Sequence, residues 1–86
     1  PKPPAPVPAR HPTLRQGARG PAVMELQRKL NACVQANPIA TDGIFGPATE
    51  SRVRTFQKAH ALAVDGIAGP ATWAVLDAEA AKRGVR

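Results

Sequence analysis

Three segments of the chain carry apolar residues at every third or fourth position, the spacing expected for one buried face of a helix. The segments span residues 21–34, 47–60 and 70–82. Their inward positions would be Val23, Leu26, Leu30 and Cys33 in the first segment, Thr49, Val53 and Phe56 in the second, and Val75, Leu76 and Ala80 in the third. The pattern predicts a small all-α domain, a three-helix bundle.

Apolar residues also occur between the predicted helices. We expect them to cover the ends of the bundle: Ile39, Ile44, Leu62, Val64 and Ile67. No segment alternates for long enough to indicate a strand, although residues 62–67 could pair briefly.

A glycine-rich loop precedes each predicted helix. Residues 42–49 read DGIFGPAT, residues 65–72 read DGIAGPAT, and residues 16–23 read QGARGPAV, a degenerate copy with Gln16 in place of the aspartate. Proline suits the first position of a helix, and the earlier glycine permits a turn with positive φ. Asp42 and Asp65 can accept hydrogen bonds from N–H groups of their own loops. We therefore expect each loop to start a helix.

The N-terminal end of the chain has a different composition. Six of the ten prolines lie within residues 1–12, which predicts an extended, semi-rigid linker rather than packed structure. Residues 13–86 would then form one domain. We expect this domain to be the C-terminal module of a larger protein. The chain shows neither a membrane-spanning run nor a signal-peptide pattern.

The charge indicates an anionic partner. Twelve Lys and Arg against six Asp and Glu give a formal net charge of +6, which favours nucleic acid, an anionic membrane or an anionic cell-wall polymer. The positive charges are spread thinly and form no dense block. The single cysteine, Cys33, cannot form an internal disulfide and is expected to be a small buried hydrophobe.

An enzymatic interpretation rests on two carboxylates, Asp42 and Asp65, because glycosidases use such a pair. Each aspartate precedes a glycine in the same type of turn, so the loop-closing role is favoured. The sequence contains no other set of base, nucleophile or metal ligands. We therefore expect no enzymatic activity, cofactor or metal.

The motifs resemble those of the bacterial peptidoglycan-binding domain of the three-helix type. The resemblance runs through LRQGARGPAVMELQRKL, DGIFGPATESRVRTFQKAHAL and VDGIAGPATWAVL, and it covers residues 14–76. Two departures concern helix ends. The family usually has glycine near the end of the first helix, where this chain has Val34-Gln35, and before the leucine that ends the second, where it has Ala61.

The resemblance implies a non-catalytic module that binds peptidoglycan and tethers an attached cell-wall hydrolase or phage lysin. The partner would be the glycan strand, the stem peptides or both, with no membrane or nucleic acid, and the domain would be a monomer. The location would be extracellular, at the cell wall or in the periplasm, or in a phage-delivered lysin.

Candidate ligand-binding residues each have a structural alternative. They are Trp73, Phe45, Gln27, Gln57, Arg15, Asp42 and Asp65, with Arg19 and Arg52 as further candidates. The two aromatic rings could stack on a sugar or could fill the core and cover the bundle end. The glutamines could bind ligand amides or satisfy loop carbonyls. The arginines could pair with stem-peptide carboxylates or be solvated.

Two other functions remain open. Three short helices with a basic balance could bind nucleic acid, but Asp77 and Glu79 lie in the predicted third helix, where a recognition helix should be basic. A protein-partner role, as in the prodomain of matrix metalloproteinases, lacks that family's Pro-Arg-Cys-Gly segment.

Overall fold

A computed structural model describes residues 12–34 and 37–84 of the 86-residue chain. Apart from Pro12, the predicted linker lies outside these residues. The described part contains three helices: α1 (Pro21–Cys33), α2 (Pro47–Ala59) and α3 (Pro70–Lys82). They agree with the predicted segments to within one residue, and no strand occurs among the described residues, so the all-α prediction is confirmed.

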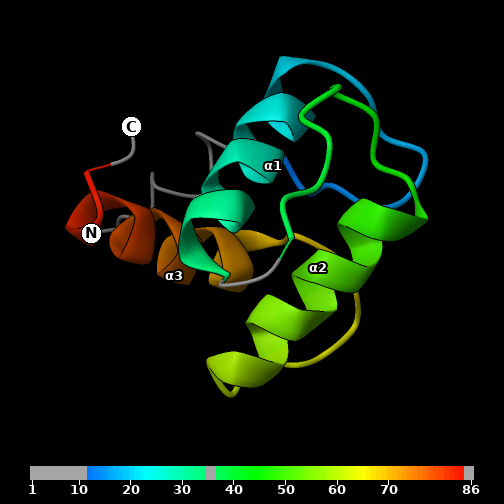
Figure 1. Ribbon diagram of the computed structural model, residues 1–86. Helices are drawn as coiled ribbons and strands as arrows, with labels where there is room; N and C mark the ends of the chain where they lie inside the picture. The colour runs from blue at the N-terminus through cyan, green and yellow to red at the C-terminus, as the bar shows by residue number, and fades with distance from the viewer. Residues whose placement is uncertain (1–11, 35–36, 85–86) are drawn as a thin grey trace, which may run out of the picture.

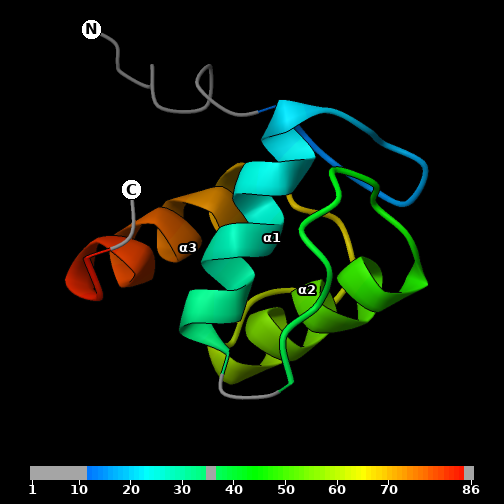
Figure 2. The ribbon, with the colours of Figure 1, turned by 45° about the horizontal axis from the view of Figure 1, so that its top comes forward.

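The first helix is the centre of the arrangement. α1 crosses the middle of the molecule and packs against both α2 and α3 (Figure 1 and Figure 2). A single core lies between the helices and the loops. It contains Leu14, Val23, Leu26, Leu30, Phe45, Val53, Phe56, Ala68, Trp73 and Leu76. None of the helices in the described part is long and apolar enough to cross a membrane.

Four of the five loop hydrophobes divide into two groups. Ile39 and Leu62 pack against the core, as expected for residues that cover the bundle ends. In contrast, 44% of Ile44 and 45% of Val64 is exposed, so the expectation that these two residues would do the same was wrong. The side chain of Ile44 lies outside because the buried position of its loop is occupied by the next residue, Phe45.

The N-terminal segment, residues 12–20, connects the two Asp-Gly loops. Leu14 and Ala68 exchange backbone hydrogen bonds of 3.0 and 2.8 Å, which makes an antiparallel bridge. Farther along, the N–H of Gly17 donates to the carbonyl of Phe45, and the N–H of Phe45 donates to the carbonyl of Ala18. The two Asp-Gly loops therefore gather around the N-terminal segment, which contains the start of the first glycine-rich loop.

Each helix begins as its sequence predicts. Gly20, Gly46 and Gly69 occupy the N-cap positions, and a proline follows each of them. The earlier glycines of the two Asp-Gly loops have positive φ, 76° at Gly43 and 74° at Gly66, a conformation that side chains disfavour.

A buried lysine fastens α1 to α3. The ammonium of Lys29 donates to Glu25 at 2.6 Å and to Asp77 at 2.7 Å, and it lies 5.8 Å from the centre of the Trp73 ring. Burial lowers the pKa of Lys29, but the hydrogen bonds to Asp77 and Glu25 outweigh this effect, so the net shift is upward.

At the end of α2, alanine occupies position 61, where the family usually has glycine. Ala61 itself adopts the left-handed conformation, with φ of 58°, and is the one non-glycine residue in the described part with positive φ. The N–H of Leu62 then donates to the carbonyl of Gln57 at 2.8 Å, which closes the helix end. Alanine disfavours this conformation, so strain is stored at residue 61.

Ala61→Gly should relieve this strain. The free energy of unfolding should rise by about 0.5–1 kcal/mol, since the left-handed cost removed exceeds the added flexibility of the unfolded chain. Ala63→Gly, a matched change at an exposed loop residue outside the positive-φ set, should be neutral or destabilising. Equal losses of stability from both variants in denaturant titrations would contradict the assignment of strain to Ala61.

Candidate binding site

A buried glutamine holds the first Asp-Gly loop. Gln27 on α1 is only 1% exposed. Its Nε2 donates to Asp42 Oδ1 at 3.1 Å, to the Ile44 carbonyl at 2.9 Å and to Thr49 Oγ1 at 3.0 Å. Its Oε1 accepts from the N–H of Gly43 at 2.9 Å. One amide thus ties α1, the loop and the first turn of α2 together.

The second Asp-Gly loop repeats this arrangement. Gln57 on α2 is also 1% exposed. Its Nε2 donates to Asp65 Oδ1, the Ile67 carbonyl and Thr72 Oγ1 at 2.8, 2.9 and 3.1 Å. Its Oε1 accepts from the N–H of Gly66 at 3.0 Å. The octapeptide therefore occurs twice because each copy pairs with a buried glutamine of the preceding helix. We call each loop together with its glutamine a joint.

The aspartates close these loops. Asp42 Oδ1 accepts from the N–H of Ile44 at 3.0 Å, and Asp65 Oδ1 accepts from the N–H of Ile67 at 2.9 Å. The N–H of Ile44, together with the Gln27 amide, holds the pKa of Asp42 below its ordinary value. The N–H of Ile67 and the Gln57 amide do the same for the pKa of Asp65. The predicted loop-closing role is confirmed, and the described residues contain no cluster of ligands for a metal ion.

The aromatic candidates lie in the core. Trp73 is 2% exposed and Phe45 is 1% exposed. The indole Nε1–H of Trp73 donates to the carbonyl of Pro12 at 3.1 Å, so the ring is also held at its polar end. Stacking of either ring on a sugar would require the core to open. Their burial agrees with the core-filling and loop-covering alternatives.

The other candidates are distributed over the surface and the joints. Gln27 and Gln57 satisfy loop carbonyls, which confirms their structural alternative. Arg15 and Arg19 are exposed on the N-terminal segment, and Arg52 is half-buried on α2. Gln27 lines a small hollow with Asp42, and Gln57 lines one with Asp65. Arg19 and Asp42 line a further hollow in the surface.

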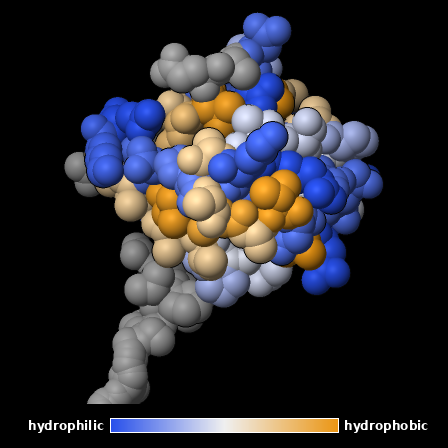
Figure 3. Space-filling model, turned by 90° about the horizontal axis from the view of Figure 1, so that it is seen from below, coloured by the Kyte–Doolittle hydropathy of each residue, from blue (hydrophilic) through white to orange (hydrophobic). Residues whose placement is uncertain are grey.

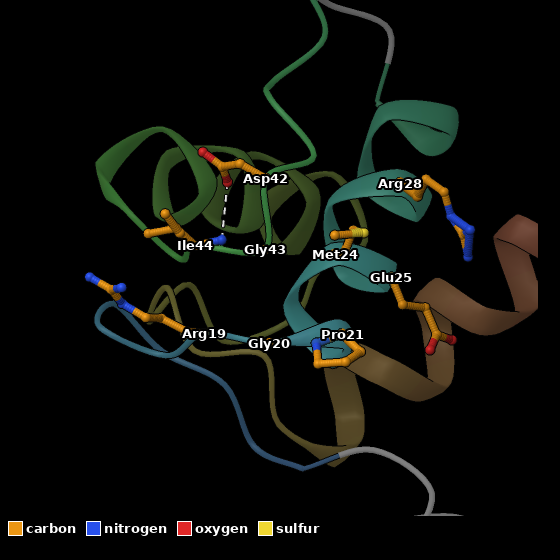
Figure 4. Close-up of a pocket in the computed structure, with 9 residues that line it drawn as sticks. All are labelled: Arg19, Gly20, Pro21, Met24, Glu25, Arg28, Asp42, Gly43 and Ile44. Carbon is orange, nitrogen blue, oxygen red and sulfur yellow. Dashed lines mark hydrogen bonds between the residues drawn. The ribbon is translucent and has the colours of Figure 1, made fainter.

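This hollow, the α1 groove, lies between the N-terminal half of α1 and the first Asp-Gly loop (Figure 4). Its volume is about 670 Å³. It is lined by Arg19, Gly20, Pro21, Met24, Glu25, Arg28, Asp42, Gly43 and Ile44. Met24 is 45% exposed and Ile44 is 44% exposed, so the groove offers apolar surface between charged side chains.

Sequence reasoning missed the apolar floor of the groove. Met24 is an apolar residue outside the buried stripe of its helix, and this was the feature of the sequence that could have indicated exposed apolar surface. Exposed apolar surface is not confined to the groove, because apolar side chains also gather between hydrophilic ones on the face viewed from below in Figure 3. At 45% exposure, Val64 is as accessible as Met24.

At the second joint, charged side chains fill the place that corresponds to the α1 groove. Three positions before each glutamine stand Met24 on α1 and Arg54 on α2. A side chain built on Gly43 would meet the backbone carbonyl oxygen of Gly20 at 3.3 Å and the Met24 methyl at 3.7 Å. One built on Gly66 would meet the side chains of Glu50 at 2.8 Å and Arg54 at 3.0 Å. Arg54 Nη2 donates to Glu50 Oε2 at 3.0 Å. The groove is thus open at one joint and filled at the other.

Two smaller hollows do follow the repeat. One, of about 230 Å³, is lined by Gln27, Ile39, Ala40, Asp42, Ile44, Gly46, Pro47, Ala48 and Thr49. The other, of about 200 Å³, is lined by the equivalent residues of the second joint, from Gln57 and Leu62 to Thr72. Because they recur with matching residues, they follow from the geometry of the joint, whereas the α1 groove distinguishes one copy from the other.

Gln57→Glu tests the joint. The substitution keeps the shape but directs a carboxylate at Asp65 Oδ1 and the Ile67 carbonyl, where the amide now donates. The free energy of unfolding at neutral pH should fall by about 2–4 kcal/mol, since buried acceptors lose their donor and two carboxylates meet. Gln16→Glu makes the same change at an exposed residue that donates to Glu50 and should cost less than about 1 kcal/mol. A similarly small loss at Gln57 would contradict the assignment.

Comparison with known proteins gives a consistent result. Residues 19–76 match the family model described as "Putative peptidoglycan binding domain". The crystal structure of Burkholderia AP3 phage endolysin is 48% identical, with a TM-score of 0.74, and the match covers 79% of this chain and 25% of that chain. The SleB N-terminal domain is 35% identical, with a TM-score of 0.71 and coverage of 81% and 94%.

A third structure is a fused zinc-dependent amidase, peptidase and peptidoglycan-binding protein of Clostridium acetobutylicum. It is 38% identical with a TM-score of 0.70, and the match covers 77% of this chain and 29% of that chain. The chain therefore spans between a quarter and a third of this protein and of the endolysin. No curated protein matches the chain.

Proposed function

The chain belongs to the peptidoglycan-binding domain family, whose members are non-catalytic binding modules, and on that premise we propose that it binds peptidoglycan through the α1 groove. We further propose that it works at the cell wall or in the periplasm, where it keeps an attached hydrolase on its substrate. The likeness to parts of an endolysin and of an amidase supports this role.

The observation that carries the proposal is the difference between the two joints. Both joints have an Asp-Gly loop, a buried glutamine and a threonine that hydrogen-bonds to it, and the α1 groove opens beside the first of them. At the second joint, Glu50 and Arg54 fill this place. The second joint shows that this fold can fill the space with side chains. A ligand therefore best explains why the groove is open and Met24 is exposed at the first joint.

The lining of the groove suits the polymer. Peptidoglycan offers methyl groups on its N-acetyl sugars and alanines, and free carboxylates on its stem peptides. Met24, Ile44 and Pro21 supply apolar contact, and Arg19 and Arg28 supply positive charge at the edge. A shallow site of this kind binds weakly. Weak binding suffices for a tether, because a short linker holds the attached domain at an effective concentration in the millimolar range.

The residues predicted from sequence take different parts in this proposal. We assign Asp42 to the groove wall and Gln27 to holding that wall in position. Gln57 and Asp65 hold the second joint. Phe45 and Trp73 support the loops from the core, and Arg15 lies outside the lining of the groove.

Met24→Arg should fill the groove in the way that Arg54 fills its counterpart. In pull-down with purified sacculi, the apparent affinity should fall by about tenfold or more, which is the loss of about 1.4 kcal/mol of contact. If the added positive charge alone mattered, Met24→Arg would strengthen binding to an anionic wall. Filling of the groove and added charge therefore predict opposite changes in affinity.

Val64→Arg is the matched control, because Val64 is exposed to the same extent and the substitution adds the same charge away from the groove. It should leave the affinity unchanged or raise it slightly. If Met24→Arg leaves the affinity for sacculi unchanged, the binding site is not in the α1 groove. Absence of the unsubstituted chain from the sacculus pellet would overturn the proposed function itself.

A further inference from the structure

The edge of the α1 groove carries charges of both signs from each of its two sides. α1 contributes Glu25 and Arg28, and the loops contribute Arg19 and Asp42. In Figure 4, Asp42 and Arg19 lie on the loop side of Met24, and Glu25 and Arg28 extend from α1 on the other side. Such an edge complements a ligand that itself carries both charges, and it offers little to a neutral one.

The aromatic residues give an independent argument about the ligand. The chain has two phenylalanines, one tryptophan and no tyrosine. Phe45, Phe56 and Trp73 are 1%, 1% and 2% exposed. The chain therefore presents no aromatic platform, the surface on which the apolar face of a sugar ring packs best.

We propose, resting on the proposed function, that the unit of peptidoglycan bound in the α1 groove is the stem peptide and not the glycan strand. Its free carboxylates lie against Arg19 on the loop side and Arg28 on the α1 side, and the free amino group of a diamino acid lies against Asp42. The methyl groups of its alanines lie on Met24 and Ile44. N-acetylglucosamine is neutral, and N-acetylmuramic acid carries at most one negative charge, on its lactyl carboxylate where no peptide is attached. A stem peptide with a diamino acid carries charges of both signs.

The electrostatics of the loop support this arrangement. Asp42 Oδ1 accepts from the N–H of Ile44 and from the Gln27 amide, and these bonds hold the pKa of its carboxyl below the ordinary value. The carboxylate therefore stays ionised at neutral pH and is held in one place, which reduces the ordering cost of pairing with an amino group.

The test compares four soluble ligands by chemical-shift titration of the full 86-residue chain. They are a disaccharide–tetrapeptide, glycan strands stripped of peptide with their lactyl carboxylates amidated, a free tetrapeptide with a diamino acid, and the same tetrapeptide with its carboxylates amidated. The free tetrapeptide should bind within about threefold of the disaccharide–tetrapeptide. Amidation should weaken its binding by about tenfold, as the loss of a charge-assisted hydrogen bond would. The glycan should not shift the groove residues.

Variants separate charge recognition from general damage. Arg19→Gln and Arg28→Gln should each lower the affinity for the free tetrapeptide by about tenfold and leave the affinity for the amidated tetrapeptide nearly unchanged. Lys58→Gln removes a positive charge from an exposed residue of α2 and should change neither affinity. If both arginine variants bind the free tetrapeptide as tightly as the unsubstituted chain does, the proposal is wrong.

The outcomes also separate this proposal from the function on which it rests. If stripped glycan binds as tightly as the disaccharide–tetrapeptide and the free peptide does not bind, the stem-peptide assignment is wrong and peptidoglycan binding stands. If neither the disaccharide–tetrapeptide nor intact sacculi bind, the proposed function fails and this inference fails with it.

Discussion

The hydrogen bonds of two buried glutamine amides determine how this domain is assembled. A primary amide has two N–H donors and one carbonyl acceptor, and burying it unpaired would cost several kcal/mol. Gln27 and Gln57 satisfy all of these groups with a carboxylate, a carbonyl, a hydroxyl and a backbone N–H of the following loop. In each joint the glutamine comes from one helix and the threonine hydroxyl from the next. The amide therefore fixes how successive helices meet, and the apolar core fills the space that remains.

This repeated constraint explains both the symmetry of the domain and the place where symmetry fails. The aspartate, the positive-φ glycine, the proline and the threonine recur because each is a part of the joint. The positions outside the joint are free to differ. Phe45 and Ala68 occupy the same position of the two Asp-Gly loops, and both are buried and hydrogen-bonded to the backbone of the N-terminal segment, but Phe45 alone of the two brings a large side chain to the core. Met24 and Arg54 differ in the same way, and that difference leaves the α1 groove open.

Much of the fold follows from local sequence. Gly-Pro before each helix, the helical spacing of apolar residues and aspartate before glycine predicted the helix starts and the loop turns, because these features act within a few residues of themselves. The role of Gln27 and Gln57 could not be decided in this way. Whether a glutamine is buried depends on which loop comes to lie over it, and those partners are 8 to 22 residues away. The same reason applies to Trp73, whose indole is held by Pro12, 61 residues earlier.

The groove was the least predictable feature. Ile44 was expected to cover the end of the bundle, but the alternation of the loop buries Phe45 and turns Ile44 outward. The groove then depends on the size and charge of the residue on α1 that faces the loop, which no periodicity reveals. Comparing the two joints position by position does reveal it, because the second joint shows what the same place looks like when it is filled.

Amide hydrogen exchange tests most directly whether the glutamines hold the loops. The N–H groups of Gly43 and Gly66 donate to the side-chain oxygens of Gln27 and Gln57 at 2.9 and 3.0 Å, in loops where backbone amides would otherwise exchange quickly. If the amides hold the loops, these two glycines should exchange as slowly as the helical N–H of Val53 in the core, through global unfolding. Exchange of either glycine as fast as that of exposed loop residues such as Ala63 would contradict the claim that the glutamine joints organise the fold.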